Sequence, residues 1–227
     1  MEAVGWLCSG RRRGGGEVTL GGVSEGRCDG ILLAGGAGRR YGRPKVLAEG
    51  GEWLRGAVAA LAEGGCGRVY VVLGATGPAR RDASGWWVCE SPAIAIPEGA
   101  QPVWAADWAV GVGASLRAGL RAVADAEDAA EYVAIMPVDT PDVGADVVAR
   151  VLGAARRAPS GLARATFHDR PGHPVVLYHK HWAAVIKAAQ GNSGAREFLV
   201  SRPDIVAVRC DDLATGRDHD YPPTRAR

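Results

Sequence analysis

The chain has 227 residues, of which 47% are apolar and 23% are charged. A chain of this length holds one or two domains and can bury a single large core. No run approaches the roughly 18 consecutive apolar residues of a membrane-spanning helix, so we expect a globular protein that does not cross a membrane. The 27 basic and 25 acidic residues leave a net charge of +2, which excludes nucleic-acid binding driven by overall charge.

The cysteines and the N-terminal segment indicate the cellular setting. Five cysteines, odd in number, widely spaced and without a C-x-x-C pair, favour neither a disulfide framework nor a zinc site and are typical of the reducing cytoplasm. The first residues lack the apolar stretch of a secretion signal and place three arginines beside three glycines. We expect residues 1–27 to be a flexible prefix, residues 28–221 to form one domain, and residues 222–227 to be a flexible tail.

Buried strands and amphipathic helices alternate along this domain. A strand from Gly30, a glycine loop over 35–45, a helix over 52–63 and a strand from Arg68 come first. The later pattern predicts a helix over 114–126, a strand over 131–139, a helix over 141–157, strands over 161–167 and 174–178, helices over 181–190 and 194–201, and a strand over 204–209. This alternation predicts a three-layer α/β/α fold with a Rossmann-like, mostly parallel sheet.

Residues 75–103 do not follow the alternation. The segment contains several prolines and no sustained period, so we expect a loop with at most one short strand near residues 86–88. The adjacent Trp86 and Trp87 could stack on an aromatic ligand. In an α/β protein we expect them to serve packing instead.

The most informative stretch is LLAGGAGRRYGRPK, residues 32–45, between a predicted strand and a predicted helix. Ligands of α/β proteins bind at such positions. Glycine allows close backbone approach, and free backbone N–H groups attract anions, as do the four nearby cations. The loop therefore resembles a triphosphate cradle, and a plain glycine turn with surface arginines is the alternative. The residues concerned are Gly35, Gly36, Gly38, Arg39, Arg40, Arg43 and Lys45.

Two common glycine motifs do not fit this loop. A Walker A loop requires Gly-Lys-Ser/Thr, whereas Lys45 follows Pro44 and precedes Val46. A dinucleotide fingerprint starting at Gly36 meets Tyr41 where its last glycine is required. The pattern disfavours both a P-loop NTPase and a dinucleotide-dependent hydride transfer.

Carboxylates follow two of the predicted strands. Asp139 comes at the carboxyl end of an apolar strand, where it could hold Mg²⁺ on phosphate oxygens, although a turn or helix cap is the alternative. Asp218 and Asp220 follow the last predicted strand and could supply a second carboxylate, or they could be solvated. The sequence thus places carboxylates after two predicted strands, and together these could bind one divalent ion.

Other polar residues open predicted elements. Ser115 and Arg117 lie at the start of a predicted helix, where they could bind an anion or the substrate, or cap the helix. His173 starts a predicted strand and could reach a substrate. His179 and His181 are two residues apart and do not form a metal pair on one helical face.

LLAGGAGRRYGRPK resembles, position by position, the L-A-(A/G)-G-x-x-x-R-(M/F)-G-x-x-K signature of the MobA-like nucleotidyltransferases, which add CMP or GMP to molybdopterin. Five further segments resemble the cytidylyltransferase branch of that family in the same order. They are DWAVGVGASLRAGL (107–120), MPVDTPDV (136–143), RPGHPVVLYHKHW (170–182), GNSGAREFL (191–199) and GRDHD (216–220). Two features depart from the cytidylyltransferase branch. The opening L-A-G-G is the motif more usual in the guanylyltransferase branch, and D-H-D-Y-P-P replaces the closing D-x-D-T-P-E-D.

The resemblance implies a reaction and a set of roles. The terminal phosphate of molybdopterin attacks the α-phosphorus of a nucleoside triphosphate, with CTP favoured, and pyrophosphate leaves. The implied catalytic residues are Lys45, Arg40 and Asp139, and the nucleotide would be bound by Leu33, Ala34, Gly35, Gly36, Gly38, Arg40 and Lys45. The implied substrate-binding residues are Ser115, Arg117, His173, Gly194 and Arg196, and Asp139 with Asp220 would hold Mg²⁺.

The resemblance also implies partners and leaves alternatives. We expect a nucleoside triphosphate, a molybdopterin-type substrate and a molybdoenzyme that receives the product, with no nucleic acid or membrane. One alternative is a GTP-dependent guanylyltransferase, or a transferase for another small phosphate. Another is a non-catalytic nucleotide-binding partner of a molybdoenzyme.

Overall fold

The computed structural model describes residues 26–90 and 93–221. The expected tail and the first 25 residues of the expected prefix lie outside this range. Gly26 and Arg27, which we expected in the prefix, instead contact the domain. Gly26 is buried, and its carbonyl oxygen accepts a 2.9 Å hydrogen bond from Arg156 Nη2. Arg27 forms a 2.6 Å ion pair with Asp128.

A seven-stranded sheet forms the middle layer, in the order β10-β8-β9-β7-β1-β2-β6. Only β9 runs against its neighbours, and the other adjacent pairs are parallel. This confirms the predicted α/β fold with a mostly parallel sheet. The strands are β1 (Cys28–Leu33), β2 (Cys66–Leu73), β6 (Ala100–Trp104), β7 (Tyr132–Pro137), β8 (Leu162–Phe167), β9 (Arg170–Tyr178) and β10 (Val206–Arg209).

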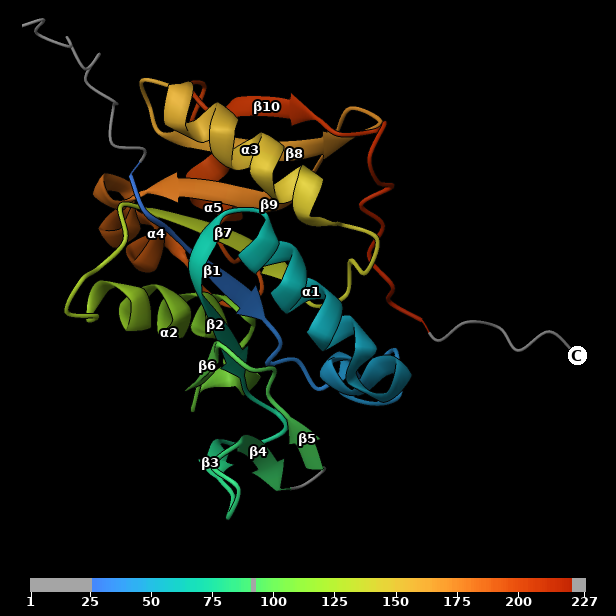
Figure 1. Cartoon of the computed structure of the whole chain (residues 1–227). Helices are drawn as coiled ribbons and strands as arrows, with labels where there is room; N and C mark the ends of the chain where they lie inside the picture. Colours follow the sequence, from blue (N-terminus) through green and yellow to red (C-terminus); the bar gives the residue numbers. More distant parts are fainter. Residues whose placement is uncertain (1–25, 91–92, 222–227) are drawn as a thin grey trace, which may run out of the picture.

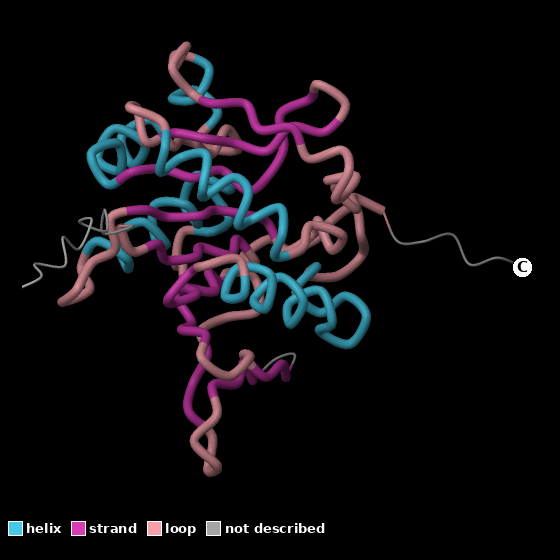
Figure 2. Tube along the Cα trace, turned by 45° about the horizontal axis from the view of Figure 1, so that its top comes forward, coloured by secondary structure: helices cyan, strands magenta, loops and turns pink. Residues whose placement is uncertain are grey.

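Helices cover both faces of the sheet (Figures 1 and 2). One face carries α1 (Glu52–Glu63) and α3 (Ala145–Arg157), whose apolar residues share one core. The other carries α2 (Val112–Ala124), α4 (Trp182–Ala188) and α5 (Arg196–Val200). Short 3-10 helices are η1 (Lys45–Gly51), η2 (Trp108–Val110) and η3 (His179–His181). Among the described residues no helix has the length and apolar character needed to cross a membrane.

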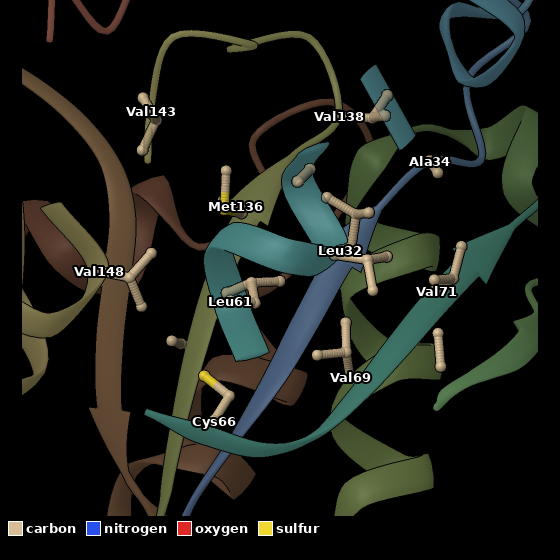
Figure 3. Packing of buried hydrophobic residues seen from close by; sticks show 14 of the residues in the cluster. Leu32, Ala34, Leu61, Cys66, Val69, Val71, Met136, Val138, Val143 and Val148 are labelled. Carbon is tan, nitrogen blue, oxygen red and sulfur yellow. The ribbon is translucent and has the colours of Figure 1, made fainter. Parts of the chain in front are cut away.

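The two cores follow from the period of two along each strand. On β1, Leu32 belongs to the core under α1 and α3, whereas its neighbour Ile31 belongs to the core under α2. Figure 3 shows Leu32 with Val69, Val71 and Leu61 in the first of these cores. Because side chains of central strands are buried on both faces, such strands read as continuous apolar runs.

The segment 75–103 corrects our expectation of a loop with one short strand. It forms the antiparallel sheet β3 (Ala79–Arg81), β4 (Trp87–Glu90) and β5 (Ala93–Ala95), followed by β6 at the edge of the main sheet. Strands of three or four residues are too short to show a period, and Pro102 is tolerated in β6 because an edge strand needs fewer donors. Trp87 packs against the core, whereas Trp86 is 45% exposed. Figure 2 shows this small sheet projecting from the domain.

The order of the central strands determines where a site can form. β1 and β7 are parallel neighbours, and Leu33 at the end of β1 pairs with Pro137 at the end of β7. The glycine loop after β1 and the loop containing Asp139 therefore leave the sheet at the same edge. A ligand at this edge can contact both loops.

Candidate active site

The glycine loop uses its three predicted glycines differently. Gly38 has a φ of +60°, and a Cβ there would overlap the carbonyl oxygen of Arg43, so the turn itself requires glycine. At Gly35 a Cβ would lie 2.9 Å from Ser115 Oγ, so this glycine lets α2 pack against the loop. A Cβ at Gly36 would meet nothing within 4 Å. Packing does not explain Gly36, whose open side faces the pocket and leaves room for a ligand.

A pocket of about 480 Å³ lies at the carboxyl ends of β1 and β7. Five segments line it: the glycine loop, the residues around the start of α2, the loop after β7, the loop between α4 and α5, and the C-terminal segment. The predicted residues among its lining are Leu33, Ala34, Gly35, Gly36, Gly38, Arg40, Lys45, Ser115, Asp139 and Asp220. All the predicted nucleotide and metal positions therefore line one pocket.

Four charged side chains form an ion-pair cluster at this pocket. Lys45 Nζ donates to Asp139 Oδ2 at 2.6 Å and to Asp220 Oδ1 at 3.0 Å. Arg40 Nη1 lies 3.0 Å from Asp220 Oδ2. Lys45 and Asp139 are 15% and 18% exposed, so water screens their pair only partly. Burial acts to lower the pKa of Lys45, but the two carboxylates outweigh it and the pKa lies above its ordinary value.

Asp220 reaches this cluster through the C-terminal segment, residues 210–221, which follows β10. Side-chain contacts hold the segment: Asp142 Oδ2 accepts hydrogen bonds from the backbone N–H of Thr215 at 2.7 Å and of Gly216 at 3.2 Å. The backbone N–H of His219 donates to Asp139 O at 3.0 Å. Figure 1 shows the segment, in red, running from β10 along one side of the domain.

Asp218 is a third carboxylate near the pair. Partial burial and the negative charges of Asp139 and Asp220 raise its pKa. Among the described residues no three His, Cys, Asp or Glu side chains gather into a metal site.

The structure separates the two predicted residues of α2. Ser115 is buried and lines the pocket. Arg117 is not among the lining residues, and its guanidinium pairs with Asp107 at 2.9 Å and hydrogen-bonds the carbonyl oxygen of Ala189. Residues two apart in a helix point to different sides, so both could not face one ligand.

Three more predicted substrate residues lie outside the pocket lining. His173 is the fourth residue of β9, which begins at Arg170, whereas we expected this strand to start near Pro174. Burial lowers its pKa, and the charge of Asp139 acts against that shift. Gly194 packs near Val112, and Arg196 is an exposed residue at the start of α5. Their sequence segments approach the pocket, but these side chains do not line it.

Sequence reasoning missed several residues of the pocket lining. Trp108, Val112 and Asn192 line it, together with Tyr41 and several small residues, and Arg39, one of the four cations expected in the loop, lines it too. Trp108 and Val112 lie in the DWAVGVG stretch and Asn192 lies in GNSGAR. The resemblance therefore indicated the segments that line the pocket, but it did not indicate these residues within them. Gly111 has a φ of +137°, and a Cβ at this position would overlap Asn192. The absence of a side chain at Gly111 therefore lets the segment before α2 contact the segment that contains Asn192.

The MobA-like NTP transferase domain matches residues 30–206 of the chain. The chain belongs to the MobA-like NTP transferase family. This membership confirms the resemblance, and at the level of the family it confirms a nucleotidyltransferase. Among curated relatives, the nicotine blue oxidoreductase of Paenarthrobacter nicotinovorans is 34% identical over 200 residues, covering 84% of this chain and 91% of that protein.

Solved structures share the fold at lower identity. Rv0371c from Mycobacterium tuberculosis H37Rv superposes with a TM-score of 0.67 at 21% identity, covering 87% of this chain and 95% of that one. The same protein is also known as a manganese complex, with a TM-score of 0.61 at 20% identity and coverages of 81% and 88%. A nucleotidyl transferase from Methanothermobacter gives a TM-score of 0.61 at 16% identity, covering 86% and 93%. These likenesses confirm the nucleotide-diphospho-sugar transferase-like fold.

Proposed function

We propose that this protein transfers a nucleoside monophosphate from a triphosphate, preferentially CTP, to a phosphorylated acceptor of the molybdopterin type. One observation carries the proposal: Lys45, Asp139 and Asp220 converge at the edge of a pocket lined by the glycine loop. A glycine-lined pocket with a partly buried ammonium suits a polyphosphate. The CTP preference is supported by the five segments that resemble the cytidylyltransferase branch.

In the proposed reaction an oxygen of the acceptor's phosphate attacks the α-phosphorus. A new P–O bond forms, the bond from the α-phosphorus to the α,β-bridging oxygen breaks, and pyrophosphate leaves with that electron pair. Such transfers depend on positioning and charge neutralisation more than on covalent catalysis. Lys45 stays charged at neutral pH because its pKa is raised, so it can neutralise phosphate oxygens. Arg40 adds a second, more exposed charge.

The carboxylates at the pocket fit a divalent cation. Asp139 and Asp220 contact the same ammonium nitrogen, so the two carboxylates lie close enough together for one ion to bind both. Carboxylates and phosphate oxygens are the ligands that Mg²⁺ uses in nucleotide sites. We propose that these two residues hold Mg²⁺, which when bound would neutralise charge on the triphosphate.

The part of the pocket lined by η2, by the start of α2 and by Asn192 is suited to the rest of the substrates. Trp108 and Val112 offer apolar surface, and the amide of Asn192 offers a donor and an acceptor. Ser115 adds a hydroxyl beside Gly35. We assign this wall to the base or to the acceptor ring, and we place transfer of the product to a molybdoenzyme after the reaction.

The test is an assay of pyrophosphate release with CTP, GTP, ATP or UTP, Mg²⁺, and molybdopterin present or omitted. We expect release that requires the acceptor and is fastest with CTP, together with a product whose mass has increased by that of a cytidylyl group, which is CMP less one water. The matched controls are Lys45→Met, which removes the buried charge, and Arg39→Met, which removes a charge that pairs with neither Asp139 nor Asp220. Fastest release with GTP would assign a guanylyltransferase instead, and no release with any triphosphate would contradict the proposal.

The curated relative supports a second candidate. Its name is that of an oxidoreductase, and 34% identity over 84% of this chain makes a redox reaction in the same pocket a specific alternative. The sequence lacks the dinucleotide fingerprint, because Tyr41 stands at the last glycine position. Incubation with NADH or NADPH and a dye acceptor separates the two functions. Oxidation of the nicotinamide without pyrophosphate release would assign the redox function.

A further inference from the structure

An aromatic chain connects the glycine loop to the C-terminal segment. Tyr41 of the loop, 5% exposed, lies against Trp53 in the first turn of α1, with ring centroids 5.5 Å apart. Trp53 also contacts the ring of His219, at 5.3 Å and an interplanar angle of 62°. Tilted and edge-on contacts at these distances are favourable arrangements of aromatic rings. Trp53 thus touches both segments that carry the proposed phosphate and metal groups.

His219 is placed so that its contacts determine where Asp220 lies. Its backbone N–H donates to Asp139 O at 3.0 Å, and the next residue, Asp220, pairs with Lys45 and Arg40. Residues 214–220 form neither helix nor strand, so no ladder of backbone hydrogen bonds fixes them. The position of Asp220 therefore depends on a few side-chain contacts, and the ring of Trp53 is the apolar contact next to Asp220, on His219.

We propose that Trp53 is a positioning residue that holds Asp220 at the pocket by packing against His219. Trp53 also contacts Tyr41 and so couples the glycine loop to the C-terminal segment. When the glycine loop is ordered, this contact favours the position of Asp220 at the pocket. This inference rests on the proposed function for its catalytic meaning, because Asp220 is the proposed second carboxylate. Trp53 itself does not line the pocket.

Hydrogen exchange of the nucleotide-free protein tests the contact directly. The amide of His219 reports on the segment because it is protected by Asp139 O. With Trp53→Leu or His219→Ala we expect this amide to exchange about tenfold faster, since each variant removes an aromatic pair. Trp53→Phe should restore most of the protection. Trp86→Leu, which alters a tryptophan on the projecting small sheet, is the matched control and should have no effect at His219.

Binding of Mn²⁺ with α,β-methylene CTP, followed by the EPR signal of free Mn²⁺, tests the consequence. We expect Trp53→Leu and His219→Ala to weaken Mn²⁺ binding about tenfold and Trp53→Phe to bind like wild type. His219→Ala lies on the C-terminal segment and leaves the core intact, so global unfolding does not explain a shared loss. Unchanged His219 exchange in both variants would overturn the inference. A wild-type protein that binds neither Mn²⁺ nor the analogue would contradict the proposed function instead.

Discussion

Lys45 and Asp139 are 94 residues apart in the chain, yet their side chains form a 2.6 Å ion pair at the edge of the pocket. The pair exists because β1 and β7 are parallel neighbours whose following loops leave the same edge of the sheet. Asp220, 175 residues from Lys45, joins the same ammonium. The predictions below depend on this cluster, with two exceptions that concern the other end of the sheet.

Replacing Lys45 by alanine should lower turnover about 100-fold, or roughly 3 kcal/mol, because a partly buried charge aimed at phosphate oxygens is lost. Arg39→Ala should cost much less, since Arg39 is exposed and Arg40 makes the ion pair with Asp220. Steady-state rates with saturating triphosphate measure both. Equal losses in the two variants would favour a diffuse basic surface over an organised site.

Asp139→Asn and Asp220→Asn should each raise the Mg²⁺ concentration that gives half the maximal rate. The double variant should lose less than the sum of the two free-energy losses, because the first change already disables the shared ion. A titration of rate against Mg²⁺ for the four proteins gives the coupling. Strict additivity, or a normal titration of Asp220→Asn, would leave Asp139 as the only proposed ligand.

Removal of the Lys45 charge should lower turnover, but it should strengthen the binding of a metal ion to the protein without nucleotide. In the wild type the ammonium already compensates both Asp139 and Asp220, so a metal ion must compete with it. In Lys45→Met the two carboxylates face each other without that cation, and Mn²⁺ alone should bind about tenfold more tightly. EPR titration measures it, with Arg39→Met as control. Weaker binding in Lys45→Met would show that the ammonium does not occupy the metal's place.

The pH dependence of stability should reveal a buried acid far from the pocket. Asp29 is fully buried, its Oδ2 has no hydrogen-bond partner among the described residues, and burial raises its pKa despite Arg27 and Arg68. A raised pKa in the folded state means that ionised Asp29 costs stability at neutral pH. This cost disappears as the pH falls through the folded-state pKa towards the unfolded value of about 4.

Asp29→Asn should therefore be more stable than wild type at pH 7, and its advantage should shrink towards pH 4. Urea unfolding of both proteins at several pH values measures the difference, and every other titrating group is common to the two. An advantage that grows on acidification would mean that Asp29 is stabilised as the anion.

Deletion of residues 2–24 should leave the melting temperature and the rate nearly unchanged. The segment carries few apolar residues and none of the motifs, so it has little surface to bury. The deletion ends before Gly26, whose carbonyl oxygen accepts a hydrogen bond from Arg156. A fall of several degrees in calorimetry would show that the segment packs on the domain.

The family, the fold class and most of the residues that line the pocket could be predicted from the amino-acid sequence. The glycine loop and Asp139 were found because each follows a continuous apolar strand, and buried parallel strands have that pattern. Because the strands of the predicted sheet are mostly parallel, the loops that follow them leave the sheet at the same edge, and this can be inferred from the sequence. Gly35, Gly36 and Asp139 come within three residues of a strand end, so the position of the strand locates them.

Side-chain directions and contacts between distant segments could not be predicted and are seen in the folded protein. Arg117 was predicted beside Ser115, but the helical turn points it to Asp107. Residues 79–95 form a small sheet whose strands are too short to leave a period. The link from Tyr41 through Trp53 to His219 joins three parts of the chain that no local pattern relates. Such contacts are set by packing, which is a property of the assembled layers and not of any single segment.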